Sequence, residues 1–291
     1  MAGGVMSERQ LDFDEPPKIS LSKLILSRKP GLEPGESIPR LEAHLRSWTV
    51  PTVPEYRAVC GLTEGPLPIL YPQILAEPLH LALASHPDMP LPAMGLVHVR
   101  QSVAQVRPIL EGEQVGISCW LEGQRTARRG VEADIHTALR DEDGQVIWRG
   151  ISTVLSKHGP GDGLKRQQPE QAPLHVRRSA AWSIPGNQGR KYAKVSGDWN
   201  PIHTTALTAK LFGFKRAIAH GMWTLARALG ELDEDLPTHS VGVTASFRRP
   251  VLLPSRVLFE SGERGDSLGF EVREAKSGRV CLSGDINPLV R

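Results

Sequence analysis

Apolar and polar residues alternate along several stretches of the chain, with the period of two that is typical of half-buried β-strands. Apolar residues at helical spacing mark two further stretches, residues 72–84 and 222–232. Pro78 lies inside the first of these and predicts a kink or a break in that helix. The predicted strands comprise residues 95–110, 115–122, 131–139, 146–155, 240–250, 256–260, 268–274 and 279–286.

The predicted elements occur twice in the same order, a helix followed by four strands. An Arg-Pro dipeptide at residues 107–108 corresponds to one at 249–250, and the hairpin turn signal at 143–144 corresponds to one at 277–278. The offset is about 140 residues in both cases, which is a repeat of domain size. We therefore predict an α+β protein in which each half is an antiparallel sheet wrapped around a central helix.

Two segments lie outside these halves. Residues 1–20 carry charges and prolines without an apolar segment, so we expect a flexible leader rather than a signal peptide. Residues 158–173 are polar and rich in glycine and proline, as a linker is. Their Gly-Pro-Gly-Asp-Gly sequence fits neither nucleotide-binding glycine motif. The predicted domains are thus residues 21–157 and 174–291.

Composition and charge narrow the class of protein. A chain of 291 residues is long for one domain and natural for two. The net charge is only +3 and the basic residues are scattered, which argues against a nucleic-acid partner. No apolar run approaches the length of a membrane span. The three cysteines, Cys60, Cys119 and Cys281, fit no metal spacing and favour a reducing, cytoplasmic setting in which they are small buried side chains.

One segment, residues 192–223, stands apart from the alternating pattern. It reads YAKVSGDWNPIHTTALTAKLFGFKRAIAHGMW. The pattern S-G-D-x-N-P-I-H is followed by an alanine, then G-F, then I-x-H-G-M. These positions are Ser196, Gly197, Asp198, Asn200, Pro201, Ile202, His203, Ala209, Gly213, Phe214, Ile218, His220, Gly221 and Met222. In this pattern the segment strongly resembles the MaoC-like dehydratases, of the (R)-specific enoyl-CoA hydratase type.

The resemblance implies a fold and a reaction. It implies a tandem, or double, hotdog in which one chain forms a pseudo-dimer, and a hydro-lyase that reversibly hydrates 2-enoyl thioesters to 3-hydroxyacyl thioesters. It implies Asp198 and His203 as the catalytic pair and the Gly221 N–H as the oxyanion donor. Further residues of the motif are expected to bind substrate or to support the site, namely Ser196, Gly197, Asn200 and His220. A homodimer and an acyl carrier protein are candidate partners.

The residue types suit this chemistry. Hydration of a 2-enoyl thioester needs a water directed at C3, a base for its proton and an acid to protonate C2. Asp198 and His203 are five residues apart across a proline-containing turn, so they can hold one water between them. Gly221 begins a predicted helix, whose free N–H and dipole can stabilise negative charge on the thioester oxygen.

Structural interpretations stand beside these catalytic ones. Taken singly, Asp198 could cap a helix and His203 could be a buried histidine with satisfied hydrogen bonds. Asn200 is expected to brace the loop, and His220 to orient the turn into the helix. The apolar residues of that helix are expected in the core, namely Trp223, Leu225 and Leu229.

The first half departs from the motif. Residues 55–57, Glu-Tyr-Arg, lie about 140 residues before Asp198 with no equivalent pattern nearby. Residues 70–72, Leu-Tyr-Pro, stand where a His-Gly pair would precede the first helix. We therefore expect a degenerate first half and one site per chain. The resemblance implies that this half still forms a wall of the acyl-binding tunnel.

Two other functions compete with hydration. A hotdog thioesterase would carry a catalytic carboxylate on or beside the central helix, where only Glu231 is available, near the far end. A protein that binds acyl thioesters without turnover is the other alternative, and the intact motif argues against it. Nothing in the sequence predicts a metal or a redox cofactor.

The carrier of the acyl group stays open between coenzyme A and acyl carrier protein. Either could meet basic residues near the motif or at the end of a strand, although these can equally be ordinary solvated side chains. They are Arg190, Lys191, Lys194, Arg248 and Arg249.

Overall fold

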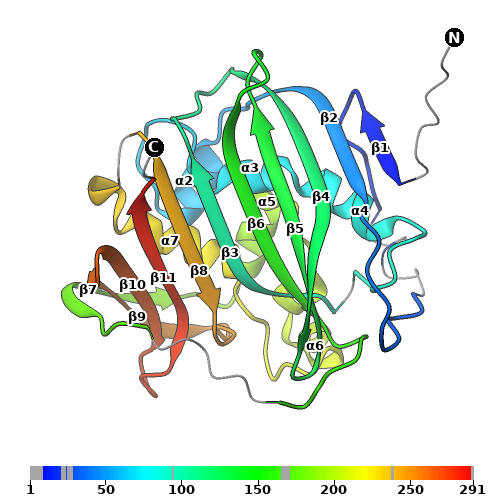
Figure 1. Cartoon of the computed structure of the whole chain (residues 1–291). Helices are drawn as coiled ribbons and strands as arrows, with labels where there is room; N and C mark the ends of the chain where they lie inside the picture. The colour runs from blue at the N-terminus through cyan, green and yellow to red at the C-terminus, as the bar shows by residue number, and fades with distance from the viewer. Residues whose placement is uncertain are drawn as a thin grey trace, which may run out of the picture.

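A single eleven-stranded sheet runs through the computed structural model, which describes residues 9–20, 24, 29–93, 95–164, 171–236 and 239–289. The strand order is β1-β2-β4-β5-β6-β3-β8-β11-β10-β9-β7, and every pair is antiparallel except β1 with β2 (Figure 1). The strands are β1 (Gln10–Phe13), β2 (Glu42–Thr49), β3 (Val97–Gln105), β4 (Gln114–Ala127), β5 (Gly130–Arg140), β6 (Val146–Ser156), β7 (His175–Ile184), β8 (Val241–Phe247), β9 (Ser255–Arg264), β10 (Ser267–Glu274) and β11 (Val280–Pro288).

The sheet consists of two five-stranded halves that meet where β3 pairs with β8. Counted outward from this junction, the first half runs β3-β6-β5-β4-β2 and the second runs β8-β11-β10-β9-β7. The sequence landmarks fall at matching places, because Gly144 and Gly278 each turn the hairpin into the strand next to the junction strand. Both glycines have positive φ, 77° and 67°, which the turns require. The predicted α+β double hotdog is confirmed.

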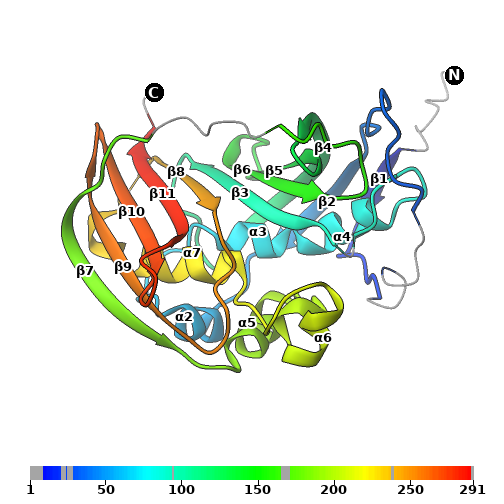
Figure 2. The same ribbon diagram turned by 90° about the horizontal axis from the view of Figure 1, so that it is seen from below.

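The helices lie on one side of the sheet. Figure 2 shows α3, α4 and α7 directly beneath the strands, with α2, α5 and α6 beyond them. They are α2 (Pro54–Cys60), α3 (Tyr71–Leu75), α4 (Glu77–Ser85), α5 (Gln188–Ser196), α6 (Ala206–Leu211) and α7 (Gly221–Gly230), with 3₁₀ turns η1 (Pro201–His203) and η2 (Asp233–Asp235). None of the helices within the described residues is long and apolar enough to cross a membrane.

The core is continuous across the two halves. Leu225 and Leu229 on α7 are buried, as their helical spacing predicts, and belong to the same apolar cluster as Tyr56 and Leu79 of the first half. The indole N–H of Trp223 donates to the carbonyl of Val59 on α2, 2.9 Å away. Helix α7 is thereby held by both halves.

Several elements differ from their prediction. The break expected at Pro78 separates α3 from α4 at Ala76. Residues 9–20 of the expected flexible leader are described, and within them Gln10–Phe13 pair with β2, so the expectation is wrong for this strand. Residues 1–8 of the leader and 165–170 of the expected linker lie outside the described residues.

The packing around β11, which lies next to the junction strand β8, yields a stability prediction. A methyl group on Gly284 of β11 would overlap the ring of Phe270 and the carbonyl oxygen of Thr244. We expect Gly284→Ala to lower the free energy of unfolding by about 1–3 kcal/mol, as overpacking does. The matched control is Gly186→Ala, whose methyl would lie 3.7 Å from Pro254 in ordinary contact. Equal denaturation midpoints for the two variants would contradict this packing.

Candidate active site

Three side chains shape the loop that carries Asp198. Each accepts a hydrogen bond from the backbone N–H two residues further along the chain. Helix α5 ends at Gly197, whose φ of 79° turns the chain away from the helix. The hydroxyl of Ser196 accepts from the N–H of Asp198, and Asp198 Oδ1 accepts from the N–H of Asn200 at 3.0 Å. Asn200 Oδ1 in turn accepts from Ile202 N–H and caps η1. Each of these side chains therefore helps to fix the position of the Asp198 carboxylate.

His203, at the end of η1, is buried and oriented by one hydrogen bond. Its Nδ1 donates to the carbonyl oxygen of Ile218 at 2.8 Å, so in the neutral ring Nε2 carries the lone pair. Burial lowers the pKa of His203 below its ordinary value, although the nearby Asp198 carboxylate opposes this. At neutral pH the ring is therefore uncharged and able to accept a proton.

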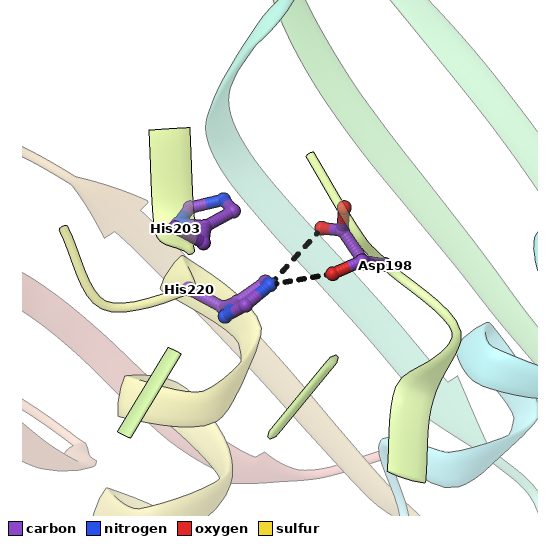
Figure 3. Close-up of side chains that lie close together, drawn as sticks. All are labelled: Asp198, His203 and His220. Carbon is purple, nitrogen blue, oxygen red and sulfur yellow. Dashed lines mark hydrogen bonds and ion pairs between the residues drawn. The ribbon is translucent and has the colours of Figure 1, made fainter. Parts of the chain in front are cut away.

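The ring of His220 stacks on that of His203 and also hydrogen-bonds to the backbone of Asp198 (Figure 3). The ring centroids of the two histidines are 3.7 Å apart, and the planes are inclined by 25°. His220 Nε2 donates to the backbone carbonyl of Asp198 at 3.0 Å and lies 3.6 Å from its Oδ2. Burial, followed by the neighbouring His203, lowers the pKa of His220 to about 3, so this ring stays neutral.

The carboxylate of Asp198 is the charged and accessible member of the cluster. Its side chain is 40% exposed, whereas His203 and His220 are 8% and 3% exposed. Burial raises its pKa, but His220, His203 and the Asn200 N–H outweigh that effect and hold the pKa below its ordinary value. One ligating atom from each of the three residues lies within 4.8 Å of the other two. A single water can therefore contact both Asp198 and His203.

Gly221 is the first residue of α7, as the motif predicts. The first N–H groups of a helix have no intrahelical acceptor and lie at the positive end of its dipole. A methyl group here would lie 2.9 Å from the ring of Phe247, so only glycine fits. Gly221 lines a cavity of about 240 Å³ together with Arg248 and Arg249.

A larger cavity of about 450 Å³ lies on the Asp198 side. Its walls combine the catalytic loop with elements of the first half. Ile74 and Leu81 contribute from α3 and α4, and Ile135 and Val154 from β5 and β6. The first half thus supplies the apolar surface next to Asp198.

Sequence reasoning missed His98 on β3, which lines both cavities. Its Nε2 donates to the carbonyl of Arg100 at 2.9 Å, and burial lowers its pKa to about 4. Its ring packs 4.8 Å from that of Phe247. The strand containing His98 could be predicted from the alternation, but its place beside the motif depends on the pairing of β3 with β8.

The matching position in the first half lacks these groups. Helix α2 ends at Gly61 with φ 65°, as α5 ends at Gly197, but the next residue is Leu62 rather than an aspartate. Helix α7 is preceded by His220 and begins at Gly221. At the matching place, α3 is preceded by Leu70 and begins at Tyr71. A cavity of about 310 Å³ at this position is lined by apolar side chains such as Leu62 and Leu229 and by polar ones such as Arg57 and Asp233.

Comparisons with known proteins find a matching family model and several similar proteins. The family model described as "MaoC like domain" matches residues 165–281, which include every residue of the cluster. The chain is 36% identical over 239 residues to 3-hydroxyacyl-thioester dehydratase X of Mycobacterium tuberculosis, covering 81% of this chain and 85% of that protein. It is 22% identical over 213 residues to peroxisomal enoyl-CoA hydratase 2 of Arabidopsis thaliana, covering 66% of this chain and 68% of that protein.

A solved structure shows the same arrangement of elements. The crystal structure of HtdX from M. tuberculosis superposes with a TM-score of 0.73 at 32% identity, covering 85% of this chain and all of that one. Its agreement extends over both halves of the sheet, and not over the motif alone.

Proposed function

This chain belongs to the MaoC-like dehydratase family, and we propose that it uses Asp198 and His203 to move one water molecule on and off an acyl thioester. The reaction is the interconversion of 2-enoyl and 3-hydroxyacyl thioesters by a hydro-lyase. One observation carries the assignment of residues. An ionised carboxylate and a neutral imidazole lie within 4.8 Å of each other beside a cavity and the first turn of a helix.

The geometry supports a single bound water as the reactant. The Asp198 carboxylate and the lone pair on His203 Nε2 hold the water and take its proton while its oxygen bonds to C3. The C2–C3 π electrons move toward the thioester carbonyl, whose oxygen gains negative charge. The N–H of Gly221 at the positive end of α7 stabilises that oxygen. The proton then passes to C2, and the reverse sequence removes water.

The thioesterase alternative has weaker support. Glu231, the carboxylate beside the central helix, caps the C-terminal end of α7 and pairs with Arg227 at 2.5 Å. It also accepts from the indole of Trp182. The Glu231 carboxylate is therefore already paired with Arg227 and Trp182. It also lies at the end of α7 that is away from Asp198.

We propose that the phosphate-bearing arm of the carrier lies along the cavity that contains Gly221. Arg248 and Arg249 line it, and either coenzyme A or acyl carrier protein supplies a phosphate for them. Assay of the same enoyl group on each carrier identifies the one used. The resemblance to (R)-specific hydratases supports the R configuration at C3, which chiral analysis of the product tests.

We also propose a reducing compartment, the cytoplasm, as the place of action. All three cysteines are buried and form no disulfide. Fractionation of the source cells tests this.

The catalytic pair yields the first functional prediction. Asp198→Asn keeps an acceptor for the Asn200 N–H but loses the charge and basicity, and His203→Ala removes the second contact to the water. Each change should lower kcat by about 10²–10⁴, with little change in KM, because neither group mainly binds the acyl chain. Loss of enoyl absorbance measures the rate.

The double variant tests whether the two residues act as one unit. It should be barely slower than the slower single variant. Asp143→Asn, in the exposed β5–β6 turn, is the control and should match the wild type. A well-folded Asp198→Asn variant with near wild-type turnover would refute the catalytic role and favour a binding protein.

The pKa directions predict the acid limb of the pH profile. The active form needs unprotonated Asp198 and neutral His203, and both pKa values lie below their ordinary ones. The kcat/KM should thus stay level as pH falls to the ordinary imidazole value of about 6.5 and decline only below it. In Asp198→Asn, His203 loses the charge that raises its pKa, so any residual activity should persist to lower pH. An acid limb centred above the ordinary value would be inconsistent with a buried neutral His203.

We propose that the reaction needs neither a metal nor a redox cofactor. The three residues of the cluster could bring ligand atoms to one metal ion, but His220 Nε2, the nitrogen that faces the Asp198 carboxylate, keeps its proton in a hydrogen bond to the backbone carbonyl of Asp198. Dialysis against a chelator should change kcat/KM by less than about twofold, whereas loss of a catalytic metal would cost orders of magnitude. Activity lost on chelation and restored by a divalent ion would overturn this proposal.

A further inference from the structure

His98 lies where the two cavities beside the catalytic loop meet. One, of about 450 Å³, contains Asp198, and the other, of about 240 Å³, contains Gly221. Among the described residues only His98 lines both. Its side chain is half-buried, and the centroid of its ring lies 4.8 Å from that of Phe247 on β8. A thioester with C3 at Asp198 and its carbonyl oxygen at Gly221 therefore passes beside this ring.

The hydrogen bonds of His98 leave one ring nitrogen as an acceptor. Nε2 donates to the backbone carbonyl of Arg100 at 2.9 Å, so in the neutral ring Nδ1 carries the lone pair. Burial lowers the pKa of His98 to about 4, and the carbonyl of Arg100 opposes this only in part. The ring is therefore neutral near neutral pH and presents a lone pair rather than a positive charge.

Nδ1 is unpaired and accessible. The amide of the neighbouring Gln101 is bound elsewhere, to the Ser152 hydroxyl and the Ser102 carbonyl, and no hydrogen bond within the described residues reaches Nδ1. The fully buried unpaired polar atoms of the described residues belong to other side chains, so Nδ1 keeps accessible surface. Its lone pair repels negative charge on the thioester oxygen, so His98 cannot share the oxyanion role of Gly221. It needs a partner that donates a hydrogen bond.

The donors of the substrate are few. An unsubstituted 2-enoyl thioester has none in its acyl part, because its carbonyl oxygen only accepts. The hydroxyl of the hydrated product donates, but in the proposed mechanism that group lies between Asp198 and His203. The remaining donors are the amide N–H groups of the pantetheine arm, which coenzyme A and acyl carrier protein share. The first of them lies two carbons beyond the sulfur, and it is present both before and after the addition of water.

We propose that His98 Nδ1 accepts a hydrogen bond from the amide N–H of the pantetheine arm nearest the sulfur. The inference rests on the proposed function, in which the arm lies along the cavity that contains Gly221. The bond is the same in substrate, transition state and product, so it contributes to binding rather than to the chemical step. It fixes the thioester along the line from Asp198 to Gly221. The first half thereby binds the carrier arm as well as forming a wall of the acyl cavity.

Two truncated substrates that differ in this donor alone test the contact. They are the trans-2-hexenoyl thioesters of N-acetylcysteamine and of 2-acetoxyethanethiol, in which an ester oxygen replaces the N–H. The wild type should hydrate the amide with a kcat/KM about tenfold higher, because the ester leaves Nδ1 without a donor. In His98→Phe, which keeps a ring but no acceptor, the ratio should fall to about twofold or less. Because the ratio compares two substrates on one protein, a general loss of activity cancels from it.

The full carrier gives a second readout. With trans-2-hexenoyl-CoA, His98→Phe should raise KM about tenfold and change kcat by less than about twofold, as the loss of uniform binding does. The matched control is Val99→Ala, an apolar change in the Gly221 cavity, which should keep the wild-type preference for the amide.

Three results would overturn the proposal. One is a wild type that hydrates the amide and the ester equally well. Another is a preference for the amide that persists in His98→Phe, since the N–H would then be bound elsewhere. The third is a fall in kcat for trans-2-hexenoyl-CoA with no change in KM, which would place His98 in the chemical step. A wild type that hydrates none of the three thioesters, the CoA substrate included, would instead refute the proposed function and this inference with it.

Discussion

The antiparallel pairing of β3 with β8 is the contact on which the rest of the structure depends. It joins two five-stranded halves into one sheet and brings the start of β3, with His98, next to the end of β8 and the first turn of α7. Each half alone would leave a junction edge and one face of its helices exposed. The cavity beside Asp198 exists because the catalytic loop of one half faces α3 and α4 of the other.

The same junction explains how one half could lose its chemistry. A pseudo-two-fold arrangement creates two equivalent positions, and the one after α2 has Leu62, Leu70 and Tyr71 in place of the functional residues. Its walls still include Ala226 and Leu229 of α7, and a cavity of about 310 Å³ remains there. The first half is then free to shape the acyl cavity of the second. His203 and His220 stay neutral beside it, and the ionised Asp198 remains in contact with solvent.

Much of this architecture could be predicted from the chain. Eight strands and the helix α7 follow from apolar spacing, and the motif locates Asp198, His203, His220 and Gly221. Strands β1, β2 and β7 and helices α2, α5 and α6 are not predicted. Strand β1 and helices α2 and α6 are short, and β7 has mostly exposed residues. The place of His98 could not be predicted either. It lies in the first half and reaches the cavities only through the long-range pairing of β3 with β8.

The most direct measurement is a crystal structure of the Asp198→Asn variant with an intact 2-enoyl thioester bound. The account predicts C3 of the substrate facing one water between residues 198 and 203. It also predicts the thioester oxygen at the N–H of Gly221 and the acyl chain running toward α3 and α4. A substrate seated in the cavity beside Leu62, or with C3 turned away from His203, would contradict it.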